Sequence, residues 1–292
     1  MTELRKEAQS LIDRGVTPEL ISQVFENILH KVVKKINSLA ISMHGFDMKA
    51  VLSNYYATQL PKQLFHESRS HIATIIVDAV YASRYDYEGA GPYENDMSDF
   101  EDGFNLIGIK KVLGGRVDDS FSVEGIGITF KPHVDGFENL GVVKNPEILI
   151  LKDMSIEVKL DILKRGPNVV LTSQAFDEDL KQELAKRCMY FADLVSEDDL
   201  NRVTEATCAT MISYNHNYPQ RIRIGTCKSF QQKIYGNEVF GIFSGCPRGK
   251  VATIVLYGND QYIEEAEVYV RDLIPEVRSV MKEHTLVDGH KY

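Results

Sequence analysis

Few residues in this sequence have the types and spacing that chemistry needs. The adjacent carboxylates Asp118 and Asp119 could form an acid pair, although adjacent acids on a turn are more typical of turn formation. Among the histidines, only His66 and His71 come near helical spacing, and positions five residues apart do not share one face of a helix. We therefore predict no metal site; His133 and His216 are likewise isolated.

The cysteines give no sign of a metal site. They are spaced by about twenty residues and form no C-x-x-C pair, whereas zinc ligands cluster at short spacing. The four are Cys188, Cys208, Cys227 and Cys246. Reduced thiols, as in a cytoplasmic protein, are the expected state. Phosphate-loop, dinucleotide-binding, nucleophile-elbow and H-E-x-x-H motifs do not occur, so we predict no cofactor site.

The composition is that of a globular chain. Of 292 residues, 43% are apolar and 26% are charged, which are ordinary values for a globular protein. A chain of this length and apolar content can bury a sizeable core. The formal net charge of -9 argues against nucleic-acid binding, which needs a basic surface. No apolar run approaches the roughly 18 residues of a membrane span, and the polar start MTELRKEAQS does not look like a signal peptide. We expect a cytoplasmic protein without nucleic-acid or membrane partners.

The first third of the chain reads as helical. Helices are predicted over residues 2–14, 17–40, 48–56 and 62–81. Gly15 suits the end of the first helix, and Thr17-Pro18 suits the start of the second. The second has an apolar stripe at helical spacing: Leu20, Ile21, Val24, Ile28, Val32 and Ile36. Residues 82–104 are acidic and rich in Gly and Tyr, which is typical of a surface loop, with a partner-docking segment as the alternative.

The elements that position any site are organised around residues 106–130. Residues 107–112 predict a strand that is apolar on one side and cationic on the other, through Lys110 and Lys111. Gly114-Gly115 breaks it. A second β-type run over 123–130 contains Gly125 and Gly127, and glycine inside a strand indicates a bulge or another backbone passing close by.

Strands and helices alternate in the next part of the chain. Strands are predicted over 145–151, 168–172 and 190–195, and helices over 155–164, 177–187 and 196–206. This order predicts a sheet covered by helices. From Arg221 the period becomes two, which predicts antiparallel strands over 221–224, 239–243 and 252–256. A last helix is predicted over 261–282. The fold class is therefore α/β, or α+β.

Several motifs in order resemble one family. The run GIKKV-x-GG-x₃-DS-x₂-V-x-G from Gly108 resembles the crossing from intermediate to apical domain in group II chaperonins, the CCT family. Val77–Val80, Asn145-Pro146 with its strand, and Val169–Leu171 match further elements of that family. Phe243-Ser244-Gly245-Cys246-Pro247 resembles the F-x-G-C-P turn of its eta-type subunits. The last helix, with Glu264, Glu265, Glu267, Arg271-Asp272 and Val277-Arg278, resembles the final intermediate-domain helix.

The resemblance implies an apical-like domain inserted in a discontinuous intermediate-like domain. The expected boundaries are 1–106 for the first intermediate-like part with the acidic insertion 82–104, 107–236 for the apical-like domain, and 237–292 for the second intermediate-like part. It also places Asp272 at the aspartate that helps to activate water for ATP hydrolysis. Tyr257 stands where the family has arginine.

Two departures from the family shape the functional prediction. Its phosphate loop and G-D-G-T-T motif would precede Met1, and its G-G-G-A segment would follow Val287, so the equatorial domain is expected to be missing and Asp272 to be idle. Only 16 residues, 152–167, stand where the family carries a helical protrusion. The helix 155–164 resembles what remains of the substrate-facing helix. Its residues Ile156, Leu160 and Leu163 are the candidates for client contact, or else core.

We therefore predict a protein-binding module that is not an enzyme. The first hypothesis is a degenerate chaperone module that holds protein clients without ATP hydrolysis. The alternative is a structural or scaffold subunit fixed in a larger protein assembly, such as a cytoskeletal or ciliary complex. A third possibility is an ATPase assembled with a separate equatorial polypeptide.

Overall fold

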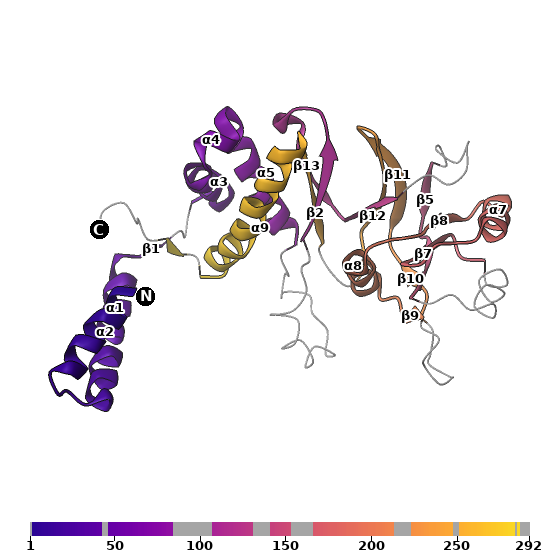
Figure 1. The fold of residues 1–292 in the computed structure, drawn as a ribbon. Helices are drawn as coiled ribbons and strands as arrows, with labels where there is room; N and C mark the ends of the chain where they lie inside the picture. Colours follow the sequence, from indigo (N-terminus) through magenta and orange to yellow (C-terminus); the bar gives the residue numbers. More distant parts are fainter. Residues whose placement is uncertain are drawn as a thin grey trace. The chain divides into compact units, whose positions relative to one another are not determined.

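The computed structural model describes residues 2–42, 46–83, 107–130, 141–152, 166–212, 223–247, 251–283 and 285–286. The chain divides into two compact units, shown in Figure 1: residues 1–48 with 278–292, and residues 49–277. Helices and sheets are both present, which confirms the α/β class. The predicted domain boundaries at 106/107 and 236/237 stay a prediction.

The first unit contains a helical hairpin and a small sheet. Helices α1 (Thr2–Asp13) and α2 (Pro18–Leu39) are joined at Gly15, whose φ of 87° is the left-handed conformation expected of a helix-ending glycine. Thr17 is the N-cap residue of α2, but its side chain makes no capping hydrogen bond. Strands β1 (Ile41–Ser42) and β14 (Thr285–Leu286) pair antiparallel.

The predicted apolar stripe of α2 is mostly not buried in this unit. Only Ile21 is, with 7% of its surface exposed. The other five members have between 45% and 52% exposed, and we call them the α2 apolar face: Leu20, Val24, Ile28, Val32 and Ile36. A helical hairpin has too few neighbours to cover every apolar position, so helical periodicity located the stripe without deciding its burial.

The helices at the start of the second unit differ from the predicted ones in length and continuity. Helix α3 is Met48–Gln59. The single helix predicted over 62–81 is wrong, because it is divided into α4 (Lys62–Phe65), a 3₁₀ turn η1 (His66–Ser68) and α5 (Arg69–Ala82). His66 has a φ of 43°, which a continuous α-helix cannot contain. Helix α5 packs on the sheet described next and is buried along most of its length.

A three-stranded sheet has the order β2-β13-β3. Its strands are β2 (Ile107–Leu113), β13 (Ala252–Gly258) and β3 (Phe121–Glu124). Strand β13 is antiparallel to β3 but parallel to β2, so the antiparallel prediction for 252–256 holds for only one of its two neighbours. Parallel pairing needs a long crossover, and residues 114–251 provide it.

Gly125 is the point at which the chain leaves one sheet for another. The predicted continuous β run is two strands: β3 pairs with β13, whereas β4 (Ile126–Phe130) pairs with β12 (Glu238–Ser244). Gly125 has a φ of 144°, and a Cβ there would lie 2.3 Å from the backbone oxygen of Phe243. The predicted close approach of another backbone is therefore confirmed at this glycine.

The four-stranded sheet is antiparallel, in the order β4-β12-β11-β5. Strand β11 (Ser229–Tyr235), which the sequence pattern did not indicate, forms a hairpin with β12 around Gly236-Asn237; β5 is Val142–Lys144. The predicted strand 221–224 is not found in its described half. Arg223 and Ile224 precede the short strand β10 (Gly225–Thr226), and residues 221–222 lie outside the described ranges.

A five-stranded sheet contains the predicted alternation of strands and helices. Strands β6 (Glu147–Leu151), β7 (Val169–Thr172) and β8 (Tyr190–Ala192) are parallel, with β9 (Met211–Ile212) and β10 also paired to β6. Helix α7 (Glu178–Lys186) packs on one side, and α8 (Glu197–Thr207) contacts β4, β6 and β10 on the other. The last helix, α9, is Asp260–Glu283. The predicted helix 155–164 lies outside the described residues.

Candidate functional site

The residues that the sequence singled out for client contact cannot be placed. Ile156, Leu160 and Leu163 lie outside the described residues, so their role stays a prediction. Asp272 is described, and it lies exposed on α9. Its neighbour Arg271 forms an ion pair with Glu267, one turn earlier in the same helix.

Asp118 and Asp119 form a turn. They belong to the 3₁₀ turn η4 (Val117–Asp119). The Asp119 carboxylate accepts a hydrogen bond from the backbone N–H of Arg116 at 2.7 Å, and Asp118 accepts one from the Ser68 hydroxyl at 2.6 Å. The bond from Ser68 holds the pKa of Asp118 below its ordinary value. Turn formation, the favoured reading of this pair, is confirmed.

The histidines do not converge on a site. His66 lies at the break between α4 and α5, and the His71 Nε2 atom is 2.8 Å from the backbone oxygen of Ser120. His133 and His216 lie outside the described ranges. Within those ranges, no three His, Cys, Asp or Glu side chains lie close enough together to hold a metal ion.

All four cysteines are free thiols. Cys188 is exposed, whereas Cys227 belongs to the core between the sheets and Cys246 packs against that core. Burial raises the pKa of Cys227 to about 11 and that of Cys246 to about 12. These two thiols therefore stay protonated at neutral pH, which makes them poor nucleophiles and poor metal ligands.

A buried charge cluster joins β2 to α8. The Asp199 carboxylate, in the first turn of α8, forms ion pairs with the Lys110 Nζ atom and, at 3.0 Å, with the Arg202 Nη2 atom. The exposed fractions of these side chains are 15% for Lys110, 8% for Asp199 and 10% for Arg202. Burial lowers the pKa of Arg202, and the Asp199 carboxylate acts in the opposite direction. We call these three residues the Asp199 cluster.

The Arg202 guanidinium occupies the space above a glycine. A Cβ added to Gly108 would lie 1.3 Å from Arg202 Nη1. The Arg202 Nε atom is buried and has no hydrogen-bond partner among the residues that the structure describes. A buried donor without an acceptor costs about 1–3 kcal/mol of free energy. A hydrogen bond donated by this N–H group to a new acceptor would recover that cost.

The opposite face of β2 carries the second lysine. Lys111 Nζ lies 2.7 Å from Glu264 and 2.9 Å from Glu267, both on α9. These two carboxylates raise the pKa of Lys111. The prediction that one side of β2 is cationic is therefore wrong, because consecutive residues of a strand point to opposite faces. Lys110 reaches α8 and Lys111 reaches α9.

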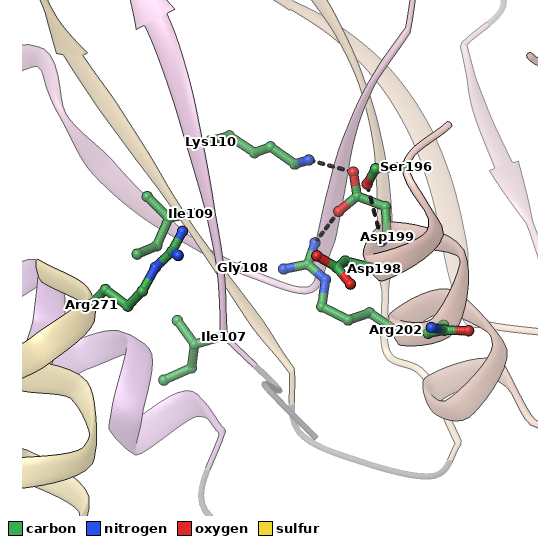
Figure 2. A pocket seen from close by; sticks show the side chains of 10 residues that line it. Ile107, Gly108, Ile109, Lys110, Ser196, Asp198, Asp199, Arg202 and Arg271 are labelled. Carbon is green, nitrogen blue, oxygen red and sulfur yellow. Dashed lines mark hydrogen bonds and ion pairs between the residues drawn. The ribbon is translucent and has the colours of Figure 1, made fainter. Parts of the chain in front are cut away.

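A cavity of about 360 Å³ lies beside the Asp199 cluster, as Figure 2 shows. Its lining comes from β2, α8 and α9: Ile107, Gly108, Ile109, Lys110, Ser196, Asp198, Asp199, Asn201, Arg202 and Arg271. Ser196 caps α8 by accepting a hydrogen bond from the Asp199 N–H at 3.2 Å, which fixes the start of the helix at the cavity. In Figure 2, the Arg271 side chain comes from α9 and lies near Ile109.

Sequence reasoning did not identify this site. It placed Asp199 and Arg202 only within the predicted helix 196–206, gave neither a role, and assigned Lys110 to a cationic strand face. One signal was available, since Asp199 and Arg202 stand three residues apart on one helix and can pair. The pairing across 89 residues to Lys110 has no local signature.

Comparisons with known proteins agree with this architecture. The family model of the TCP-1/cpn60 chaperonin family matches residues 1–161 and 154–290. The T-complex protein 1 subunit eta of Arabidopsis thaliana is 33% identical over 98% of this chain and 55% of its own length. That of Saccharomyces cerevisiae is 26% identical over 98% of this chain and 56% of its own length.

A solved structure supports the fold. The open-state monomer of a group II chaperonin from Methanococcoides burtonii superposes with a TM-score of 0.72, covering 99% of this chain and 70% of that one, at 22% identity. The chain spans about half the length of the Arabidopsis and yeast relatives that it matches. Because the family model matches nearly the whole sequence, this chain belongs to the TCP-1/cpn60 chaperonin family.

Proposed function

We propose that this chain is a chaperonin-derived protein-binding module that holds polypeptide ligands without hydrolysing ATP. The observation that carries the proposal is the match to chaperonin subunits along 98% of the sequence. Polypeptide binding is what the family resemblance implies for the apical-like part. The proposal places the chain in the cytoplasm with reduced cysteines. None of the helices in the described ranges is long and apolar enough to cross a bilayer.

The absence of hydrolysis is proposed from the sequence. These 292 residues contain neither G-D-G-T-T nor a G-x-x-x-x-G-K-[ST] loop, so Asp272 has no phosphate-binding partner among them. An aspartate can orient water, but phosphoryl transfer also needs phosphate contacts and magnesium ligands.

Two measurements on the purified chain test the proposal. We expect it to suppress aggregation of a chemically unfolded test protein without added nucleotide. We also expect no magnesium-dependent ATP turnover above that of the Asp272→Ala variant. ATP turnover that Asp272→Ala abolishes would instead support an ATPase completed by a separate equatorial polypeptide. Failure to slow the aggregation of the test protein would contradict the client-holding function.

A scaffold subunit of a larger assembly is the second candidate, and the α2 apolar face favours it. Five apolar side chains along one helix have about half of their surface exposed, and contiguous apolar surface commonly marks a protein interface. Sedimentation of native extract discriminates the two functions. A scaffold subunit, whether of a cytoskeletal or a ciliary complex, would co-sediment in fixed stoichiometry with one assembly, whereas a client-holding protein would spread over many sizes.

A further inference from the structure

We propose that the cavity beside the Asp199 cluster binds a carboxylate carried by an extended polypeptide, which lies along the edge of β2. The proposal rests on the proposed function only in taking a polypeptide as the ligand. Its lining, as described, does not include Ile156, Leu160 or Leu163.

The cavity has an excess of hydrogen-bond donors. Three cationic side chains, Lys110, Arg202 and Arg271, line it against the two carboxylates of Asp198 and Asp199. An ammonium group has three donor hydrogens and a guanidinium has five. Asp199 accepts one hydrogen bond from each of Lys110 and Arg202. The residues that line the cavity therefore have donors to spare and a net charge of +1, in a chain whose overall charge is -9; Arg271 also pairs with Glu267, which is not in the lining.

One donor in particular needs an acceptor. The Arg202 side chain is only 10% exposed, lines the cavity, and has a buried Nε atom without a partner among the described residues. Its orientation is fixed, because Asp199 binds the Nη2 atom and Gly108 leaves room for the guanidinium. A guanidinium that is held in place and has one unpaired N–H group matches the planar, two-oxygen geometry of a carboxylate.

The charge balance favours a carboxylate over a phosphate. A phosphate group carries close to two negative charges at neutral pH, and Asp198 and Asp199 would repel it more strongly than a singly charged carboxylate. The cavity volume of about 360 Å³ suits one or two side chains of a peptide.

The position of the cavity indicates that the ligand is an extended chain. Four consecutive residues of β2, 107–110, line it. Successive strand residues point to opposite faces, so a cavity that touches all four lies along the edge of the strand. In the described part of the sheet, β2 is an edge strand whose only neighbour is β13. An edge strand offers backbone N–H and C=O groups to an added strand.

Binding can be measured with the full chain and matched peptides. The probe is the acetylated and amidated pentapeptide Thr-Val-Asp-Val-Thr, and its control has Asn in place of Asp. Titration calorimetry gives the affinity, and the ¹H–¹⁵N signal of Arg202 Nε reports the contact directly, assigned by its loss in Arg202→Lys. We expect the Asp peptide to bind at least about tenfold more tightly than the Asn peptide, and to shift that signal downfield.

Three variants of the protein sharpen the test. Arg271→Gln should lower the affinity for the Asp peptide about tenfold, because it removes a cation that lines the cavity. Arg271 is exposed, so its loss should leave the fold intact. Asn201→Asp should lower the affinity similarly by adding negative charge at the exposed rim. Arg187→Gln is the matched control, since Arg187 forms the same i, i+4 pair with Glu183 on α7, away from the cavity, and should bind as the parent chain does.

Each other result counts against the proposal. Equal affinity for the Asp and Asn peptides would show that the site does not recognise a carboxylate. Free succinate that binds as tightly as the Asp peptide would show that the site does not recognise an extended chain. Tighter binding of inorganic phosphate would identify a general anion site, and no binding of any probe would leave the cavity to water. If the peptide binds but aggregation is not suppressed, only the proposed client-holding function fails; if aggregation is suppressed but no peptide binds, only this inference fails.

Discussion

The guanidinium of Arg202 lies where the side chain of residue 108 would be, and Gly108 is what admits it. A Cβ at Gly108 would come within 1.3 Å of Arg202 Nη1, so strand β2 and helix α8 fit together here only because residue 108 has no side chain. Arg202 is held there by Asp199, which Lys110 of the same strand also binds. The contact links strand β2 to the cavity at α8.

The first prediction concerns this contact. Gly108→Ala should displace Arg202 from Asp199 and lower the free energy of unfolding by about 2–4 kcal/mol, through overpacking and loss of a buried ion pair. Urea denaturation followed by circular dichroism measures the change. In an Arg202→Ala background, the same Gly108→Ala substitution should cost less than about 1 kcal/mol. An equal cost in both backgrounds would show that the contact does not constrain residue 108.

The second prediction concerns the crossing between two sheets at Gly125. The buried Thr253 hydroxyl donates to the backbone oxygen of Gly125 at 2.9 Å and accepts from the N–H of Gly127 at 2.8 Å. Thr253→Val keeps the shape but leaves both backbone groups unpaired, so we expect a loss of about 2–4 kcal/mol in urea. Thr226→Val, at an exposed strand position, should stay within about 0.5 kcal/mol and serves as the control. A similar loss for both variants would contradict the crossing role.

The third prediction concerns the buried thiols. The folded pKa values of Cys227 and Cys246, about 11 and about 12, lie above the ordinary value of 9.0. Because folding raises them, their contribution to stability is complete below pH 9 and is lost as the pH rises toward 11–12. The urea concentration at the unfolding midpoint should decrease as the pH rises from about 8.5 to about 10.5, and it should decrease less in a variant that carries both Cys227→Ala and Cys246→Ala. Identical pH slopes would exclude these thiols as the cause.

Alkylation gives an independent measurement of the same thiols. At about pH 8, iodoacetamide should modify exposed Cys188 well before Cys227 and Cys246, as mass spectrometry of digested protein can follow. Urea should remove the difference, because unfolding exposes all of them. Early modification of Cys227 in the folded chain would show that it is not part of the core.

The fourth prediction separates two isoleucines of α2. Ile21 is 7% exposed and Ile28 is 49% exposed, although both belong to the same apolar stripe. Ile21→Ala should therefore destabilise the first unit by about 2–3 kcal/mol, and Ile28→Ala by less than about 0.5 kcal/mol. Native-state hydrogen exchange of α2 amides measures both, because it reports on this unit separately. Equal effects would mean that α2 buries its whole stripe in solution.

Local signals in the sequence determined most of the element types. The predicted helix start at 196 agrees with the Ser196 cap of α8, Gly15 ends α1, and the alternation from Asn145 onward predicts strands β6, β7 and β8, although not their parallel direction. These signals are short-range, since caps, glycine conformations and periodicity act within a few residues. The family, too, followed from motifs in order along the chain.

Only the tertiary structure decided how those elements meet. Periodicity could not show that Lys110 and Lys111 reach different helices, that β13 is parallel to β2, or that five apolar residues of α2 stay exposed. Each of these depends on which distant segment packs against a given face, and Lys110 and Asp199 are 89 positions apart. Burial and pairing depend on which distant segments pack together in the folded chain. The Asp199 cluster and its cavity are formed by strand β2 and helix α8, so only the tertiary structure could identify them.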